Sequence, residues 1–463
     1  MKNFKTKTLV AAFAGLSAAG AVGVAEAVYL NPDGLGQVLI YPYYTVRTKA
    51  AVAPFDTYLS VVNTTNSAKA VKVRFIEGKN SAEVLDFNLF LSKHDVWVAG
   101  VIRTADGAGV YTPDKSCTVP TVSADPLNPT PFVNFAYSGD GAGDSLDRTR
   151  EGYVEIIEMG SITSSTVETS VTHVAGVPPC WVKPSLLADA TVSGAVGVPT
   201  GGLFGGVTLI NVLSGEDFTA DAVALDNFRT TGKYDLPGDI KPDLQDVGTV
   251  AQIIDGANVI TDDYAIQPVD NVSAIMMRSA VYNEFVLDTG TKSTTDWVLT
   301  MPTKRYYYDS DGVVQYLFQR NFSATGACDD VNAMIYDREE QFKTTPPGFS
   351  PPPPAGKPGT VCWEANVLTF NGGNALASTN NVSLTTSYVN GWMDLSFPVA
   401  SSSIYQGNYH ELPMTSGVFQ GLPIIGFAAQ TFLNGTLTDS AGKLIQSSYG
   451  GTFVHKYKRS YAD

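Results

Sequence analysis

Hydrophobic and polar residues alternate along much of the chain, most clearly where Val71, Val73 and Phe75 are separated by Lys72 and Arg74. A period of two is typical of a β-strand with one buried face, so we expect the two charged residues to point to solvent. Comparable runs predict four consecutive strands joined by short turns, over residues 57–63, 70–76, 82–91 and 95–102. Four such strands form an antiparallel meander or a Greek key with one solvated face.

Elsewhere the pattern predicts further strands and one helix. Ala274, Met277, Val281 and Phe285 follow one another at i, i+3, i+7 and i+11, which indicates a helix over residues 271–287. Strands are expected at 37–44, 153–159, 207–212, 297–301 and 306–308, and throughout 362–463, with turn signals at 372–373, 434–435 and 450–451. The expected fold class is therefore mainly β, with immunoglobulin-like antiparallel β-sandwiches, long loops and one helix.

Shifts in composition divide the chain into five expected segments. They are a signal peptide at 1–27, an N-terminal β-sandwich at 28–125, a β-rich middle region with the helix at 126–345, a proline-rich loop at 346–361 and a C-terminal β region at 362–463.

The first strands carry a family resemblance. A strand ending in Val61-Val62-Asn63, followed by a short turn and the alternating run 71–75, resembles the immunoglobulin-like modules that are common on bacterial cell-surface proteins. The resemblance covers roughly residues 55–102 and implies only sandwich architecture, because the tryptophan and cysteine pair of antibody-type domains are missing from the expected strands.

The N-terminus has the three parts of a secretory signal. Lys2, Lys5 and Lys7 precede an apolar run over residues 9–24, and the small-x-small triplet 25–27 follows it. We expect export and cleavage after Ala27. No later apolar stretch is long enough for a transmembrane helix, so none is expected in the exported chain. Its formal net charge of −15 before cleavage argues against a nucleic-acid partner.

Four cysteines without a Cys-x-x-Cys pair favour disulfides in an exported chain. Three pairings are open. The most economical joins Cys117 to Cys180 and Cys328 to Cys362, because each bridge then closes a loop within one region.

Motifs for catalysis are weak. The histidines are far apart, and Pro413 follows His410-Glu411 and prevents the helix that a His-Glu-x-x-His zinc site needs. Glu155 and Glu158 in one strand are the nearest approach to a glycosidase pair. We therefore expect no enzymatic activity.

Two acidic, glycine-containing segments, 139–147 and 309–312, have the composition of calcium loops, because calcium takes carboxylate and carbonyl oxygens from such segments. Turn formation alone also explains both. The expected ligands of a structural calcium ion, the only cofactor predicted, are Asp140, Asp144, Asp147, Asp309 and Asp311.

Two further groups are candidates for surface contacts. Tyr43 and Tyr307 lie in tyrosine clusters that suit sugar stacking or contacts between subunits. Lys456, Lys458 and Arg459 form a basic C-terminal strand, which either protects a sheet edge or contacts an anionic envelope or the acidic face of another copy.

Together these features predict an exported structural protein without catalysis. In acidity and in its Gly-, Thr-, Ser- and Asn-rich strands the chain resembles cell-surface coat proteins, including the surface-layer proteins of Gram-negative bacteria. This resemblance implies a self-associating coat or biofilm-matrix component, assisted by calcium, at the cell surface or outside the cell. A carbohydrate-binding module or adhesin is the alternative, and a glycan-active hydrolase is the third.

Overall fold

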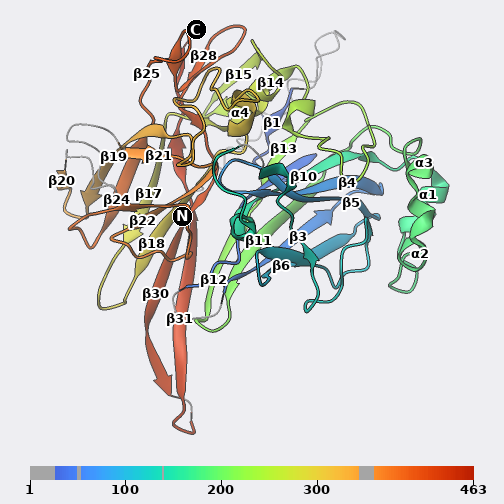
Figure 1. Ribbon diagram of the computed structural model, residues 1–463, viewed down its shortest axis with the longest axis horizontal. Helices are drawn as coiled ribbons and strands as arrows, with labels where there is room; N and C mark the ends of the chain where they lie inside the picture. Colours follow the sequence, from blue (N-terminus) through green and yellow to red (C-terminus); the bar gives the residue numbers. More distant parts are fainter. Residues whose placement is uncertain (1–26, 50–53, 138–139, 344–358, 439, 463) are drawn as a thin grey trace, which may run out of the picture.

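A computed structural model describes residues 27–49, 54–137, 140–343, 359–438 and 440–462. Strands dominate these residues and the helices are short, which confirms the mainly β fold class (Figure 1). The predicted signal peptide, except for Ala27, and most of the proline-rich loop lie outside the described residues. No described helix is long and apolar enough to cross a membrane.

Two sheets of the N-terminal half pack face to face around one apolar core. The first sheet has the order β1 (Tyr29–Leu30), β13 (Val223–Asp226), β2 (Val38–Thr45), β10 (Glu151–Ser161), β4 (Lys69–Glu77), β5 (Glu83–Leu91) and β8 (Cys117–Val119). The second has the order β12 (Glu216–Asp221), β11 (Leu203–Asn211), β3 (Asp56–Asn63), β6 (Val96–Arg103), β7 (Ala108–Tyr111) and β9 (Thr130–Pro131). We call this unit the first sandwich.

The C-terminal half contains two more sheets, which we call the second sandwich. One has the order β20 (Phe342–Lys343), β19 (Asp329–Asp337), β24 (Asn390–Ser396), β17 (Ala280–Val286) and β32 (Lys456–Lys458), with β21 (Gly359–Val361) paired to β19. The other has the order β23 (Asn381–Leu384), β22 (Ala365–Phe370), β18 (Thr294–Thr300), β30 (Phe427–Thr438) and β31 (Leu444–Val454).

The sheet that contains β18 belongs to both cores. Val298 and Val367 pack into the core of the first sandwich, whereas Trp297 and Leu368 pack into that of the second. Side chains that alternate along a strand point to opposite faces, so both faces of this sheet are buried. Thr300 also donates a hydrogen bond of 2.6 Å from its Oγ1 to the carbonyl of Pro42 on β2. The two sandwiches therefore share a layer.

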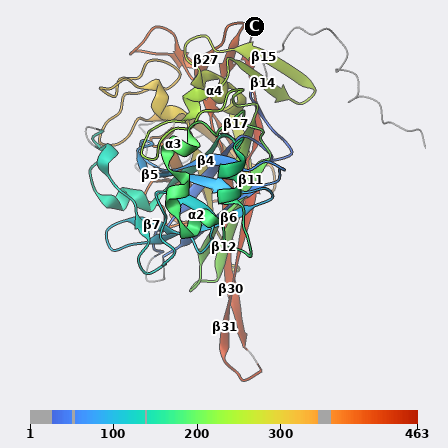
Figure 2. The ribbon, with the colours of Figure 1, turned by 90° about the vertical axis from the view of Figure 1, so that its right-hand side faces the viewer.

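Short elements cover the ends of the sandwiches (Figure 2). The small ladders are β14 (Val250–Asp255) with β15 (Asn258–Asp263), β16 (Met277–Arg278) with β29 (Leu422–Pro423), β25 (Ala400–Ser401) with β26 (Asn408–Tyr409), and β27 (Glu411–Pro413) with β28 (Val418–Gln420) and β33 (Tyr461–Ala462). The helices are α1 (Ser165–Val171), α2 (Pro179–Val182), α3 (Asp189–Val192) and α4 (Val269–Met276), with 3₁₀ turns η1 (Phe135–Tyr137), η2 (Leu146–Arg150), η3 (Pro184–Leu187), η4 (Leu244–Asp246) and η5 (Lys304–Tyr307).

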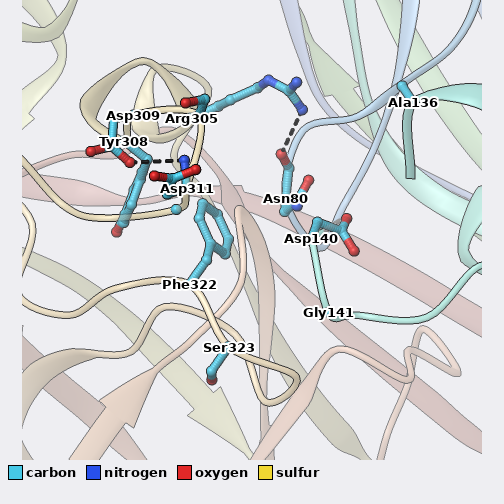
Figure 3. A pocket seen from close by; sticks show the side chains of 12 residues that line it. Asn80, Ala136, Asp140, Gly141, Arg305, Tyr308, Asp309, Asp311, Phe322 and Ser323 are labelled. Atoms are coloured by element: carbon cyan, nitrogen blue, oxygen red, sulfur yellow. Dashed lines mark hydrogen bonds between the residues drawn. The ribbon is translucent and has the colours of Figure 1, made fainter. Parts of the chain in front are cut away.

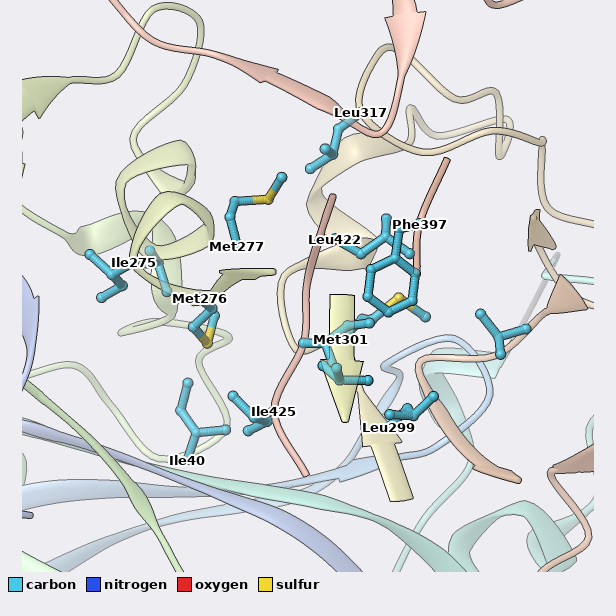
Figure 4. Close-up of a cluster of buried hydrophobic side chains, with 14 of the residues drawn as sticks. Ile40, Ile275, Met276, Met277, Leu299, Met301, Leu317, Phe397, Leu422 and Ile425 are labelled. Carbon is cyan, nitrogen blue, oxygen red and sulfur yellow. The ribbon is translucent and has the colours of Figure 1, made fainter. Parts of the chain in front are cut away.

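Helix α4 is shorter than the sequence pattern predicts. It ends at Met276, and the expected second half is the strand β17, on which Val281 and Phe285 face the core. A spacing of four residues keeps side chains on one face of a strand as well as of a helix, which is why the pattern misled. Figure 4 shows Ile275 and Met276 of α4 with Ile40 of β2 and Ile425 in this apolar cluster. Helix α4 thus packs between the two sandwiches and contributes to the core that they share.

Other local expectations fail for identifiable reasons. Residues 306–308, predicted as a strand, lie mostly in η5. The turn signals at 434–435 and 450–451 fall inside β30 and β31, where the first coincides with a shift of register. Gly450 serves close packing instead: a Cβ there would lie 2.0 Å from the carbonyl oxygen of Asp217 on β12. The signal at 372–373 joins β22 to β23, which pair in parallel.

The four strands between residues 56 and 103 are divided between the two sheets of the first sandwich. β4 pairs with β5 in one sheet, and β3 pairs with β6 in the other, which excludes the meander. Strands from β10 to β13 complete both sheets, so the expected boundary at residue 125 falls inside the first sandwich. The disulfides are those of the economical pairing, Cys117 with Cys180 and Cys328 with Cys362.

The charged side chains of β4 are buried, which corrects the expectation of a solvated face. The segment 228–247 covers this side of the first sheet, and Lys72 Nζ donates to the Leu236 carbonyl at 2.7 Å and to Asp86 at 2.8 Å. Lys69 Nζ lies 2.7 Å from Glu158 Oε1, and neither side chain is exposed. Buried charges are tolerated only when they are paired, so β4 and β10 depend on these ion pairs.

We expect Lys69→Met to lower the free energy of unfolding by about 3 kcal/mol or more, because it leaves the buried carboxylate of Glu158 without its cation. Lys93→Met is the matched control, since its Glu168 pair is partly exposed, and should cost less than about 1 kcal/mol. Urea denaturation of both variants measures the difference. Equal losses would contradict this role for the buried pair.

Candidate functional site: a polar pocket at the junction of the sandwiches

The carboxylate of Glu151 joins the two sandwiches. Its Oε2 accepts hydrogen bonds from Tyr43 at 2.7 Å and Ser378 at 2.6 Å, and its Oε1 accepts from Arg47 Nε at 3.0 Å and Thr379 Oγ1 at 2.6 Å. Burial alone would raise the pKa of Glu151, but Arg47 and the hydroxyl donors outweigh it and hold this pKa below its ordinary value. Two of these donors come from each sandwich, so one ionised group ties both halves.

A second buried cluster lies beside Glu151. The guanidinium of Arg148 donates to Glu77 Oε1 at 2.9 Å and to Asp140 Oδ2 at 2.6 Å. Glu77 in turn accepts the backbone N–H groups of Lys79 and Asn80, at 2.8 and 2.9 Å. The loop between β4 and β5 is therefore fixed by the same ion pairs that hold the loop at Asp140.

These loops form one wall of a pocket of about 410 Å³, and the opposite wall comes from the chain that follows η5 (Figure 3). The walls come close at Gly141, where a Cβ would lie 3.4 Å from the backbone nitrogen of Ala324. The lining residues are Asn80, Ala136, Asp140, Gly141, Arg305, Tyr308, Asp309, Ser310, Asp311, Gly312, Phe322 and Ser323. The two acidic segments singled out in the sequence thus meet at one pocket.

The three lining carboxylates differ in how far the protein already satisfies them. Asp140 is paired with Arg148, and Asp309 accepts from the backbone N–H groups of Asp311 and Val313 and from the side chain of Gln315. Asp311 is exposed. Of the three, Asp311 is therefore the carboxylate most available to a ligand.

The expected calcium ligands do not converge. Asp147 lies away from the pocket lining and pairs with Arg47 and Arg150, Asp144 is exposed, and Asp140 is held by Arg148. Among the described residues, no three acidic, histidine or cysteine side chains are grouped as a metal ion would need. Gly139 lies outside the described residues. Calcium at these loops stays a prediction.

Both tyrosines predicted as contact residues are buried, which corrects that expectation. Tyr43 donates to Glu151, and the hydroxyl of Tyr307 lies 2.9 Å from Asp270 Oδ1 and 2.7 Å from Ser273 Oγ. Both tyrosine clusters lie at the junction of two packed layers, so both faces of the strand or turn that carries them are covered. Tyr308, next to Tyr307, is the member of its cluster that reaches the pocket.

The basic C-terminal strand divides into two roles. Lys456 and Lys458 are exposed on the edge strand β32. Their exposure is needed both for protection of a sheet edge and for contact with an anionic envelope or another copy. Arg459 is buried instead, and its guanidinium donates to the carbonyls of Ala274, Ile275 and Met277. A cation that binds the last carbonyls of a helix stabilises that helix. Arg459 therefore caps the C-terminal end of α4 and is not a surface contact residue.

The two glutamates considered for glycosidase chemistry are buried within the first sandwich. Glu155 Oε2 lies 2.6 Å from Arg74, and Glu158 pairs with Lys69. Burial raises the pKa of Glu155 to about 7, although Arg74 opposes the shift. These carboxylates hold strands together and do not line the pocket.

Glu151 joins the two sandwiches and Asn80 lines the pocket, and neither residue is predicted from the sequence as part of a site. Asn80 lies in the short turn expected between the strands at 70–76 and 82–91, and Glu151 lies just before the strand expected at 153–159. No local motif marks either residue, because the partners of Glu151 are more than 100 and 200 positions away along the chain.

Comparison with known proteins gives no match: no family model, no curated protein and no solved structure is similar to the chain.

The buried Glu364 predicts a pH effect at this junction. It directly precedes β22 and is fully buried. Burial raises the pKa of Glu364 to about 8, which Lys304 and Arg305 only partly offset. Because the folded-state pKa exceeds the ordinary 4.5, its contribution to stability is present below 4.5 and is lost as pH rises to 8.

We therefore expect Glu364→Gln to gain stability relative to the natural chain as pH rises from 5 to 8, by on the order of 2 kcal/mol. Urea unfolding of both chains at several pH values measures the difference, and other titrating groups cancel between them. A difference that stays constant with pH would show that Glu364 is ionised throughout.

Proposed function

We propose that the protein is exported and, without catalysing a reaction, associates with copies of itself as a component of a cell-surface coat or extracellular matrix. The N-terminal sequence and two disulfides support export, because disulfides persist in oxidising compartments. The observation that carries self-association is the hairpin formed by β30 and β31.

The hairpin projects well beyond both sandwiches (Figure 1). β30 pairs with β18 only from Ala428 to Thr431, but it continues to pair with β31 as far as Thr438 and Leu444. A two-stranded ribbon without further neighbours is at best marginally stable in water. A hairpin of this length therefore supports the existence of a partner that covers it.

The outer edge of β31 offers the means of pairing. Within the described residues β31 forms a ladder only with β30, so no described strand pairs with its second edge. Tyr449 and Phe453, four residues apart on this strand, are 59% and 47% exposed, and Val454 is 68% exposed. An exposed edge strand with apolar side chains is a template for pairing with another chain.

A second copy is the partner that this geometry favours. Two identical edges can pair antiparallel about a two-fold axis, because each then presents the same surface to the other. Calcium held between acidic loops of neighbouring copies is the additional element of the proposal, since no three acidic, histidine or cysteine side chains among the described residues of one copy are grouped as a metal ion needs.

The test is light scattering after size-exclusion chromatography, on the chain from Val28 onward and on a variant in which an Asn-Gly turn replaces residues 435–447. We expect a dimer of the natural chain in chelator, larger assemblies where calcium adds a second contact, and a monomer of the shortened chain in chelator. Tyr449→Ser should weaken association at least tenfold, and Leu127→Ser, which removes an exposed side chain of another loop, should not.

Each sample is measured in millimolar calcium and again in chelator. Assemblies larger than a dimer that persist in chelator would remove calcium from the proposal and leave the hairpin contact. A natural chain that is monomeric under both conditions would contradict self-association.

A further inference from the structure

The amide of Asn80 is the strongest sign of a ligand in the junction pocket. Asn80 is buried, with a relative exposure of 6%, and its Oδ1 has no hydrogen-bond partner among the described residues. Figure 3 shows Asn80 between Arg305 and Asp140, and its side chain lines the pocket. A buried amide oxygen without a donor costs free energy, which a ligand donor would recover.

The pocket has more acceptors than donors. Asp311 is exposed at the rim, and Asp309 lies beside it with Oδ1 already engaged by two backbone N–H groups and Oδ2 by the Gln315 side chain. The exposed guanidinium of Arg305 is the lining cation, and it is held loosely by the carbonyls of Asn80 and Ser81, both at 3.4 Å. Such a balance favours a neutral or cationic ligand that donates several hydrogen bonds.

One wall of the pocket is aromatic. The rings of Tyr308 and Phe322 lie 4.4 Å apart, and both residues line the pocket. Gly312 makes room for this wall, because its φ of +74° suits glycine and a Cβ there would lie 3.1 Å from the Cβ of Phe322. An aromatic wall opposite polar groups suits a ligand with both an apolar face and polar edges.

We propose that this pocket binds a carbohydrate through an amino-sugar ring. The C–H face of the ring packs against Phe322, a hydroxyl donates to Asn80 Oδ1, and the protonated amine binds Asp311. Arg305 donates to a second hydroxyl. A lysine side chain would supply the charge but neither the ring face nor the hydroxyl groups, so a sugar uses more of the pocket.

This site is independent of the hairpin contact, because neither β30 nor β31 contributes a lining residue, and titration in chelator keeps calcium away from the acidic loops that line the pocket. Titrations are therefore made both on the natural chain and on the hairpin-shortened variant. The same affinity in both chains is expected, and it separates failure of the pocket from failure of the hairpin contact.

The experiment is isothermal titration calorimetry with a glucosamine trimer. We expect the natural sequence to bind it, Asp311→Asn to bind at least about tenfold more weakly, and Asp144→Asn, an exposed acid outside the lining, to differ by less than about twofold. The N-acetylated trimer should bind more weakly than the glucosamine trimer, and a galacturonate trimer should not bind.

Three results would overturn the proposal. They are no binding of the glucosamine trimer at millimolar concentration, unchanged affinity in Asp311→Asn, and binding of a trilysine peptide as tight as that of the sugar. The last result would assign the pocket to cationic peptides.

Discussion

The shared, buried carboxylate of Glu151 is the interaction on which the arrangement of the molecule depends. A carboxylate with no access to water must be fully hydrogen-bonded or lose its charge. Tyr43 and Arg47 from the first sandwich and Ser378 and Thr379 from the second meet this requirement together. Neither sandwich satisfies Glu151 alone, so the two halves are held in one orientation by a polar constraint as well as by the apolar faces of the common sheet.

The junction pocket follows from this arrangement. Its walls come from loops that are 160 or more residues apart in sequence. Arg148 and Glu77 hold the loops of the first sandwich, while Arg305 reaches across to the carbonyls of Asn80 and Ser81. The projecting hairpin (Figure 1) extends beyond the Thr294 end of β18, whereas Arg305 of the pocket follows its Thr300 end, which separates the proposed contact with another copy from the proposed carbohydrate site.

Local patterns predicted the strands well because a half-buried strand has a period of two whatever it packs against. Patterns failed where distant segments decide the environment. Lys72 and Arg74 appear as a solvated face in sequence, but residues 228–247 cover them, and Val281 and Phe285 satisfy the spacing of a helix and of a strand alike. The disulfide pairing was predictable because it joins the cysteines that are nearest in sequence, 63 and 34 residues apart.

The candidate site was only half predictable. The acidic segments at Asp140 and at Asp309 were visible, since Asp and Gly mark turns and oxygen-rich loops, but nothing in either segment shows that they face each other. Tyr43, Tyr307 and Arg459 have the residue types of contact surfaces, and their burial depends on partners far along the chain.

Differential scanning calorimetry of the chain from Val28 onward tests most directly whether the two sandwiches form one unit. A shared sheet and a shared carboxylate predict a single transition whose calorimetric enthalpy equals its van't Hoff enthalpy. Two separable transitions, each with its own midpoint, would contradict the coupling through Glu151 and the pocket that depends on it.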